Sequence, residues 1–380
     1  MENFIYLDNA ATTKPLKEAI LEASVYNDAY FFNASSLYLG GVKNKSELNL
    51  IKSNFQSIIG DNFDVYFTSC GSESDNMAIF SYSNRGNIVT TLGEHSAVHN
   101  TLTELKNKGY DARFAKLNKD GSVDIESLLS LVDDKTTLVS VVHVNNETGA
   151  INDINKIAKL IKEKNKRVIF HSDGVQAFMK IPYKLSLDVD LYSVSAHKIN
   201  GLKGVGAIFK NKKVNNLKPL IYGGGQENGL RSGTENLFGI KVFEQVALHH
   251  NKTLFNDYNQ VKLLKQLFID NIDNNLFEII NSDNVSPYII TMSAIGLRGE
   301  VLQHKLENDG IIIGTGSACS SKIKHSRMLK DIGYSDKFLD GVIRISFSYK
   351  TTKEEVLFSA KKLNENAKEL KKVMYNKWTK

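Results

Sequence analysis

Short runs rich in β-branched and apolar residues alternate with longer mixed stretches between about residues 64 and 210. The longer stretches, such as INDINKIAKLIKEKNK, have the polar and apolar mixture that is typical of surface helices. The short runs are DVYFT at 64–68, NIVTT at 87–91, TTLVSVVHV at 136–144, RVIFHS at 167–172 and VDLYSVS at 189–195. This alternation predicts an α/β fold with a mostly parallel sheet covered by helices.

The pattern changes after a glycine-rich segment, YGGGQENGLRSGTE at 222–235, which marks a boundary and is followed by a long helical stretch. The last third mixes strand patterns, such as SPYIITMSA, with helical ones, such as EVLQHKLENDG. We therefore expect a large domain at 16–254 and a smaller α/β domain, formed by 1–15 and 255–380, that closes over it.

Length and composition agree with an ordinary globular protein of two domains: 380 residues, 42% of them hydrophobic and 24% charged. The net charge of +6 comes from scattered lysines, which typically solvate a surface, so nucleic-acid binding is not favoured. The sequence shows neither a secretory signal nor an apolar run of membrane-spanning length. Only two cysteines occur, which argues against a disulfide framework and favours a reducing, cytoplasmic location.

Polar signatures directly follow the predicted strands: SCGSES, GEHS, NNETG, SDGVQ and SAHK. Ligands of open α/β sheets bind outside the carboxyl ends of the strands. We therefore expect these segments to line one site.

Lys198 lies in SAHKINGLKGVGA, beside Ser195 and His197. A lysine that is partly removed from water can lose its proton and form a Schiff base with an aldehyde. An isolated lysine in a loop is more often a surface residue. The neighbouring signatures favour the chemical interpretation.

Asp173 ends a strand pattern that appears buried, where an unpaired carboxylate is costly unless it meets a cation. The protonated ring nitrogen of pyridoxal phosphate (PLP) is such a cation, and lysine plus aspartate after neighbouring strands is the usual protein requirement of this cofactor. Taken alone, Asp173 is equally compatible with a turn or a helix cap.

Gly71 and Ser72 would begin a helix whose free N–H groups and dipole attract phosphate. Ser72 is equally compatible with a plain N-cap, and two acids, Glu73 and Asp75, argue mildly against an anion there. His95 can stack on a ring or relay protons, although a lone histidine is usually structural. His95 and His99 lack a third ligand nearby, so no metal site is predicted.

Cys319 lies in GTGSACSS, a run of small residues followed by Lys322, Lys324 and His325. Flexible backbone and nearby positive charge suit a mobile nucleophilic thiolate. Cys70 lies tightly between a strand and a helix, so it is expected to be a packed thiol.

Together these motifs resemble the class V aminotransferase-like cysteine desulfurases of the NifS and IscS type, which have the fold type I of PLP enzymes. The resemblance runs from YLDNAATT to GVIRISFS, and its most specific parts are SAHKINGLKGVGA, HVNNETG, GGGQENGLRSGTEN and GSACSS. It implies conversion of L-cysteine to L-alanine, with the sulfur left on Cys319 as a persulfide.

The resemblance also implies a role for each matching residue. Lys198 would hold the cofactor and act as acid and base, Asp173 would pair with the ring nitrogen, and His95 would stack on the ring. Thr234 would reach the phosphate of the other subunit's cofactor, which implies a homodimer. The remaining implied contacts are Gln176 and Asn146 to the phenolic oxygen, Gly71, Ser72, Ser195 and His197 to the phosphate, and Arg344 with Asn33 to the substrate carboxylate.

The cysteine loop is similar to that of the mobile-loop group, which implies a sulfur-acceptor protein such as an iron–sulfur scaffold or a tRNA-thiolating enzyme. SCGSES departs from the usual glycine-alanine-threonine pattern and puts Cys70 beside the phosphate site. The alternatives are a selenocysteine lyase, a transaminating relative, and a non-catalytic assembly subunit. The last of these would require Lys198 or Asp173 to be replaced.

Overall fold

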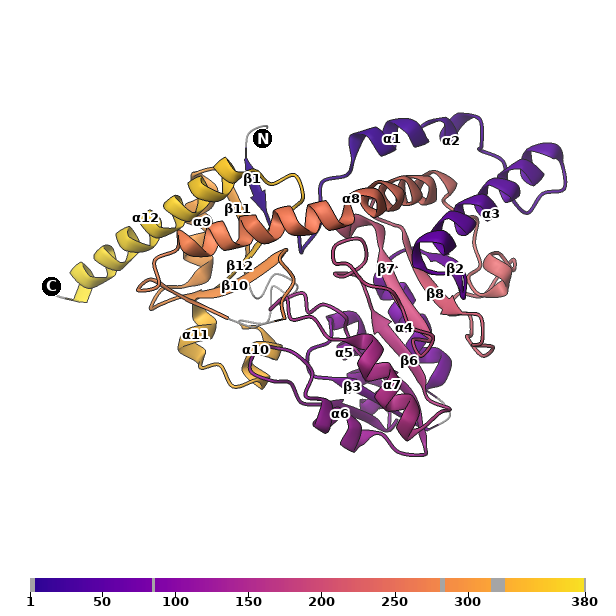
Figure 1. Ribbon diagram of the computed structural model, residues 1–380, viewed down its shortest axis with the longest axis horizontal. Helices are drawn as coiled ribbons and strands as arrows, with labels where there is room; N and C mark the ends of the chain where they lie inside the picture. The colour runs from indigo at the N-terminus through magenta and orange to yellow at the C-terminus, as the bar shows by residue number, and fades with distance from the viewer. Residues whose placement is uncertain (1–3, 84–85, 281–283, 316–324, 379–380) are drawn as a thin grey trace.

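The computed structural model describes residues 4–83, 86–280, 284–315 and 325–378, and it contains two β-sheets with helices packed around them (Figure 1). The larger sheet has seven strands, and all neighbours from β7 to β4 are parallel, whereas β8 is antiparallel to both β2 and β7. This confirms the predicted α/β class. Its order is β2 (Phe63–Thr68), β8 (Gly206–Asn211), β7 (Leu191–Ser195), β6 (Ile169–Asp173), β5 (Thr136–Ser140), β3 (Asn87–Thr91) and β4 (Ala112–Ala115).

The smaller sheet joins the two ends of the chain. Its first strand, from the N-terminal segment, pairs in parallel with β11, and the other neighbours are antiparallel. Its order is β1 (Ile5–Leu7), β11 (Ile311–Thr315), β12 (Val342–Ser346), β10 (Ile289–Ala294) and β9 (Phe277–Ile279).

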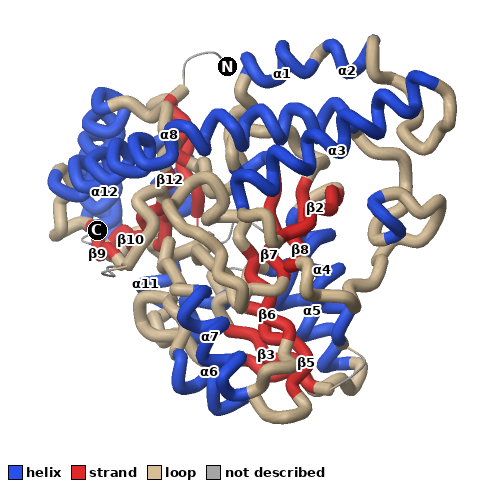
Figure 2. Tube along the Cα trace, turned by 45° about the vertical axis from the view of Figure 1, so that its right-hand side comes forward, coloured by secondary structure: helices blue, strands red, loops and turns tan. Residues whose placement is uncertain are grey.

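Helices cover both faces of the larger sheet, as Figure 2 shows for α6 and α7 on one side and α4 and α5 on the other. The first six numbered helices are α1 (Lys17–Ala23), α2 (Val25–Asp28), α3 (Leu39–Ile59), α4 (Gly71–Tyr82), α5 (Ser96–Asn107) and α6 (Ile125–Leu131). The others are α7 (Ile154–Lys164), η1 (Ala196–Lys198), η2 (Glu227–Gly229), α8 (Leu237–Asp270), α9 (Gly299–Asn308), α10 (Arg327–Asp331), α11 (Asp336–Asp340) and α12 (Lys353–Trp378).

Strand residues alternate between two cores, because successive side chains of a strand point to opposite faces. Val139 belongs to the core that also contains residues of α3, α6, α7 and α8, whereas its neighbour Leu138 belongs to the core that contains residues of α4 and α5. Both residues are fully buried. Each strand therefore needs apolar residues on both faces, which explains the nearly continuous apolar runs in the sequence.

Helix α8 contributes to the cores of both sheets and runs across the molecule in Figure 1. Its first part buries Phe243 and Val246 against the larger sheet. Its last part buries Leu264 and Phe268 against the smaller sheet. The cleft between the two sheets is therefore spanned by one continuous helix.

Candidate active site

The carboxyl ends of the strands of the larger sheet open into a cavity of about 330 Å³. Asp173 is the last residue of β6, Ser195 is the last residue of β7, and Lys198 follows in η1. Arg344 reaches the cavity from β12 of the smaller sheet. The predicted residues that line the cavity are Gly71, Ser72, His95, Asn146, Asp173, Gln176, Ser195, His197, Lys198 and Arg344.

Three predicted residues lie elsewhere. Thr234 lines a separate small cavity, together with Gly204 and Arg231. Asn33 is exposed on the segment before α3, where its Oδ1 accepts a hydrogen bond from the backbone N–H of Ser35 at 2.9 Å. Cys319 lies outside the described residues.

Lys198 is anchored by the N-terminal segment of the chain. Its Nζ donates to the backbone oxygens of Ala10 and Ala11, both at 2.7 Å. These two alanines belong to the DNAATT motif and line the cavity themselves. The segment between the smaller sheet and α1 thus holds the amine at the cavity wall.

Asp173 is buried, and its Oδ1 accepts a hydrogen bond from the N–H of Val175 at 2.9 Å. Burial raises the pKa of this carboxyl, while its interactions with His95 and Lys198 lower it. A buried carboxylate of this kind is stabilised by a cation brought against it. It therefore fits a protonated ring nitrogen.

His95 caps the N-terminus of α5, where its Nδ1 accepts a hydrogen bond from the N–H of Ala97 at 3.2 Å. Burial lowers the pKa of His95 below its usual range, so the ring is neutral near pH 7. In a neutral imidazole that accepts at Nδ1, the proton is on Nε2. The cap thus fixes both the orientation and the tautomer of the ring.

The N-terminus of α4 and the hydroxyl of Ser195 fit a phosphate group. Gly71 is the first residue of this helix, whose first N–H groups have no partner within the helix. A Cβ atom at Gly71 would lie 2.7 Å from Cγ2 of Val175, so only glycine fits this close approach. Ser195 Oγ is buried and has no hydrogen-bond partner among the described residues. A phosphate oxygen would supply the missing acceptor.

The acid in the first turn of α4 does not oppose an anion there. Glu73 accepts a hydrogen bond from the N–H of Ser69 at 2.8 Å through one carboxylate oxygen. Its other oxygen pairs with Nε of Arg231 at 3.1 Å. The charge of Glu73 is therefore compensated locally.

Arg344 is held at the opposite wall. Its Nη2 pairs with Oδ1 of Asp8 at 2.8 Å, and its Nη1 donates to the backbone oxygen of Asn146 at 2.8 Å. Its buried Nε has no hydrogen-bond partner among the described residues. Arginine carries five N–H donors, so this guanidinium retains capacity for a substrate carboxylate.

The start of α10 is anchored to loops that follow strands of the larger sheet. Ser326 donates a hydrogen bond to the carboxylate of Glu147. Arg327 donates to the backbone oxygen of Leu92 at 2.7 Å and to that of Glu94 at 3.2 Å. Glu94 directly precedes His95, so α10 is tied to the segment that presents this ring.

Two further residues line the cavity: Cys70, which the sequence placed beside the phosphate site as a packed thiol, and Asp75, which was not predicted as a site residue. Cys70 caps α4 in an extended conformation and lines the cavity. Asp75 also lines it, and burial followed by the charge of Asp173 raises the pKa of Asp75 well above its usual range. The motif SCGSES, with Asp75 directly after it, follows a predicted strand, and this position indicates that both residues lie near the site.

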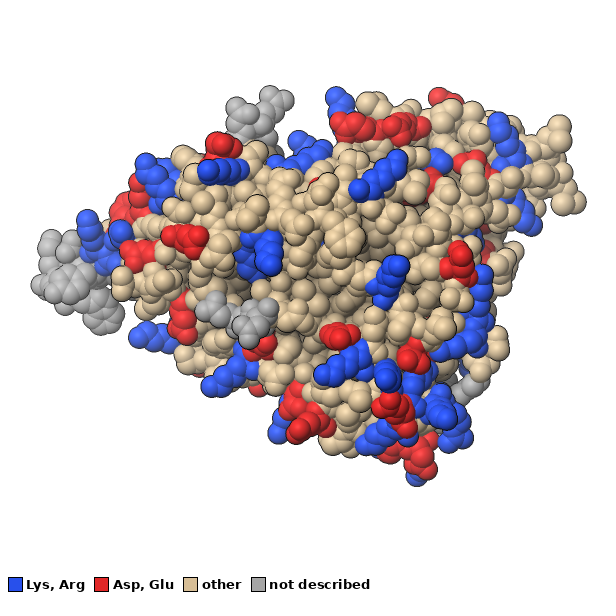
Figure 3. Space-filling model, viewed as in Figure 1, with Lys and Arg blue, Asp and Glu red and all other residues tan. Residues whose placement is uncertain are grey.

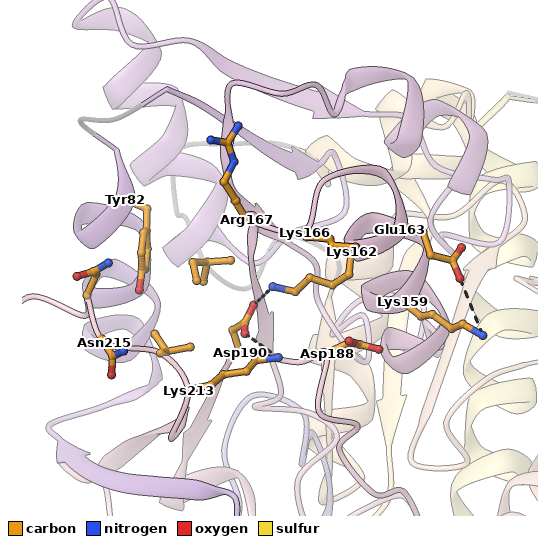
Figure 4. Close-up of a pocket in the computed structure, with 13 residues that line it drawn as sticks. Tyr82, Lys159, Lys162, Glu163, Lys166, Arg167, Asp188, Asp190, Lys213 and Asn215 are labelled. Atoms are coloured by element: carbon orange, nitrogen blue, oxygen red, sulfur yellow. Dashed lines mark hydrogen bonds and ion pairs between the residues drawn. The ribbon is translucent and has the colours of Figure 1, made fainter.

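A larger cavity of about 620 Å³ lies away from this site (Figure 4). Asp190 pairs there with Lys162 and with Lys213. The cavity contains none of the predicted site residues. A third lysine of the same cavity, Lys159, pairs with Glu163.

Among the residues that the structure describes, no three histidine, cysteine or acidic side chains are grouped so as to hold a metal ion. No helix in the same part of the chain is both long and apolar enough to cross a membrane.

Known proteins are similar to this chain over most of its length, in sequence and in structure. The family described as aminotransferase class-V matches residues 5–358. Cysteine desulfurase IscS of Clostridium botulinum (strain Hall) is 34% identical over 369 residues, covering 94% of this chain and 92% of that protein. Cysteine desulfurase IscS of Dictyoglomus turgidum is also 34% identical, with 94% and 93% covered.

Solved structures give the same picture. A NifS-like protein superposes with a TM-score of 0.88 at 32% identity, covering 96% of this chain and 99% of that one. A NifS-like protein from Rickettsia africae superposes with a TM-score of 0.86 at 26% identity, with the same coverage. A structure of SspA in complex with cysteine covers 92% of this chain and 100% of that one, with a TM-score of 0.76 at 26% identity.

Proposed function

The chain belongs to the aminotransferase class-V family of PLP-dependent enzymes, and on this premise we propose that it converts L-cysteine to L-alanine and transfers the sulfur to Cys319. The observation that carries the proposal is the cavity in which Lys198, Asp173 and His95 lie opposite Arg344. The test is brief exposure of the purified holoenzyme to L-cysteine, followed by measurement of alanine and of sulfur on each cysteine peptide. Sulfide release without sulfur on the Cys319 peptide would instead support a lyase.

PLP would be held covalently by Lys198, through its ring nitrogen by Asp173, and through its phosphate by the start of α4 with Ser195 and His197. When bound, it supplies an electron sink for the charge that develops at the substrate Cα. His95 would cover the ring with its neutral imidazole. Burial followed by the charge of Lys198 lowers the pKa of His197 to about 4, so this ring is also neutral near pH 7.

Side chains of the protein would carry out the remaining steps. Arg344 binds and orients the substrate carboxylate by a two-pronged contact. Nζ of Lys198, released when the substrate amine takes its place on the cofactor, would remove the proton from Cα and later return a proton to the product. The Cys319 thiolate attacks the substrate sulfur, forms the S–S bond and takes up the sulfur as the C–S bond breaks.

Asp173→Ala is expected to weaken retention of PLP and to lower turnover by at least about 100-fold, which corresponds to roughly 3 kcal/mol. The variant loses the buried carboxylate that stabilises a protonated ring nitrogen. Dialysis of the holoenzyme followed by cofactor assay and alanine formation measures both effects. Asp134→Ala, at an exposed turn, is the matched control and should behave as the wild type. Near-normal activity of Asp173→Ala would mean that the acidic partner lies elsewhere.

We infer that the enzyme is a homodimer. The segment between α2 and α3 exposes Phe31 and Leu37, and the first residue of α3 is the exposed Leu39; the exposed fractions of the two leucines are 95% and 89%. No charged residue occurs from 29 to 42, and the protruding end beyond α3 in Figure 3 lacks charged side chains. An apolar patch of this kind typically marks an interface. A second copy packed there agrees with the proposed reach of Thr234 into the other subunit's site.

Leu37→Glu combined with Leu39→Glu is expected to shift the protein from dimer to monomer, because two charges would be buried at the interface. Sedimentation velocity measures the shift, and PLP retention should fall with it if Thr234 acts across the interface. Leu187→Glu, at another exposed leucine, is the control. A fully active monomer would contradict the proposal.

The sulfur would pass from Cys319 to an acceptor protein in the cytoplasm, either an iron–sulfur scaffold or a tRNA-thiolating enzyme. Its identity is tested by loading the enzyme with labelled cysteine sulfur and isolating the protein that becomes labelled. If no protein of either class becomes labelled, this part of the proposal is wrong.

A further inference from the structure

A buried lysine, Lys180, is connected to the candidate active site by hydrogen bonds, although no step above uses it. Its side chain is 7% exposed. Its Nζ donates to Oε1 of Gln176 at 2.9 Å. Gln176 lines the cavity, and its own Nε2 donates to the backbone oxygen of Ala10 at 2.8 Å. The same oxygen accepts the hydrogen bond from Lys198.

This chain of contacts fixes the orientation of the Gln176 amide. If the amide were rotated by 180°, its NH₂ group would face the amine of Lys180 and its oxygen would face the oxygen of Ala10. Both contacts would then lack a proper donor–acceptor pair. Because Oε1 is occupied by Lys180 and one N–H by Ala10, the group that Gln176 retains for the cavity is its second N–H.

We propose that Lys180 is a positioning residue, which holds Gln176 so that a donor faces the cofactor's phenolic oxygen and which adds positive charge behind Lys198. The proposal rests on the proposed function only in requiring bound PLP. It assigns Lys180 no contact with substrate or cofactor.

The electrostatic surroundings of Lys180 support this role. Burial, followed by the charges of Lys198 and Arg344, lowers its pKa to about 7. His197 also lies within range of its charge. An anionic oxygen brought into such a group of cations and bases is stabilised, and it in turn favours the charged form of Lys180.

The test uses the colour of the holoenzyme as a function of pH. Bound PLP changes its absorption when the nitrogen that joins it to Lys198 loses a proton, which leaves one more negative charge in the cavity. A nearby cation and an N–H donor to the phenolic oxygen both favour that loss. Lys180→Met should therefore raise the midpoint of the absorption change by about one pH unit.

Three further variants make the result specific. Lys180→Arg retains the charge and the donors, so its midpoint should rise by less than half as much. Lys184→Met, at an exposed lysine four residues away, should leave the midpoint unchanged. Lys180→Gln replaces Lys180→Met if the latter does not fold, because it removes the same charge with a polar side chain, and the midpoint should again rise.

A double-mutant cycle with Gln176→Leu isolates the positioning role. If Lys180 acts through the amide, the shift caused by Lys180→Met should shrink to less than half when Gln176 is already replaced. Equal shifts in both backgrounds, or a wild-type midpoint in folded Lys180→Met, would overturn the proposal. Absorption needs only bound PLP, whereas alanine formation tests desulfuration, so failure of one proposal is distinguishable from failure of the other.

Discussion

Lys198→Ala is expected to abolish covalent attachment of PLP and to lower alanine formation by at least about 10⁴-fold. The variant loses the amine that Ala10 and Ala11 hold at the cavity wall, and with it both the attachment point and the group that moves the Cα proton. Reduction with borohydride followed by peptide mass spectrometry locates the attachment, and alanine assay gives the rate.

Lys203→Ala provides the matched control, since this exposed lysine lies in the same loop. It should retain cofactor and turnover. Lys180 is a buried lysine bonded into the same region, so attachment of PLP at Lys180 in the wild type would contradict the assignment.

Cys319→Ser is expected to lower sulfur release and alanine formation by at least about 100-fold while leaving cofactor binding intact. A serine hydroxyl is a far weaker nucleophile towards sulfur than a thiolate. Spectral titration with L-cysteine should still show substrate binding, because Arg344 and Lys198 remain. Alanine assay then separates binding from sulfur transfer.

Cys70→Ser is the comparison for this result. Cys70 lines the cavity at the start of α4, whereas Cys319 lies outside the described residues. The Cys70 variant should still acquire sulfur on the Cys319 peptide after brief exposure to L-cysteine. Sulfur found on Cys70 in the wild type, or a near-normal rate for Cys319→Ser, would favour the lyase mechanism.

The sequence predicted the larger sheet well because its strands are buried on both faces. The run at 136–144, for example, contains β5, whose neighbouring residues Leu138 and Val139 belong to opposite cores. The short strand β4 was not predicted individually, since four residues carry too little periodicity. The path of the chain between the two sheets was also not visible, because the helical pattern of α8 continues without interruption from one core to the other.

The site was predictable where polar residues directly follow strands, as for Asp173 and Lys198. Burial of a long polar side chain in a turn or loop could not be predicted from the sequence, because it depends on segments far away along the chain. Lys180 is an example: its environment is set by Gln176, which in turn contacts Ala10 near the start of the chain. The domain limits and the individual roles of the site residues stay predictions.

Helix α8 has a thermodynamic consequence for the whole molecule. Its 34 residues extend over about 50 Å. Melting either half would remove apolar surface from one core and fray the backbone leading into the other. Loss of one core is therefore coupled energetically to loss of the other, in the manner of a single cooperative unit. A ligand that binds in the cleft and stabilises the folded form consequently protects both ends of this helix at once.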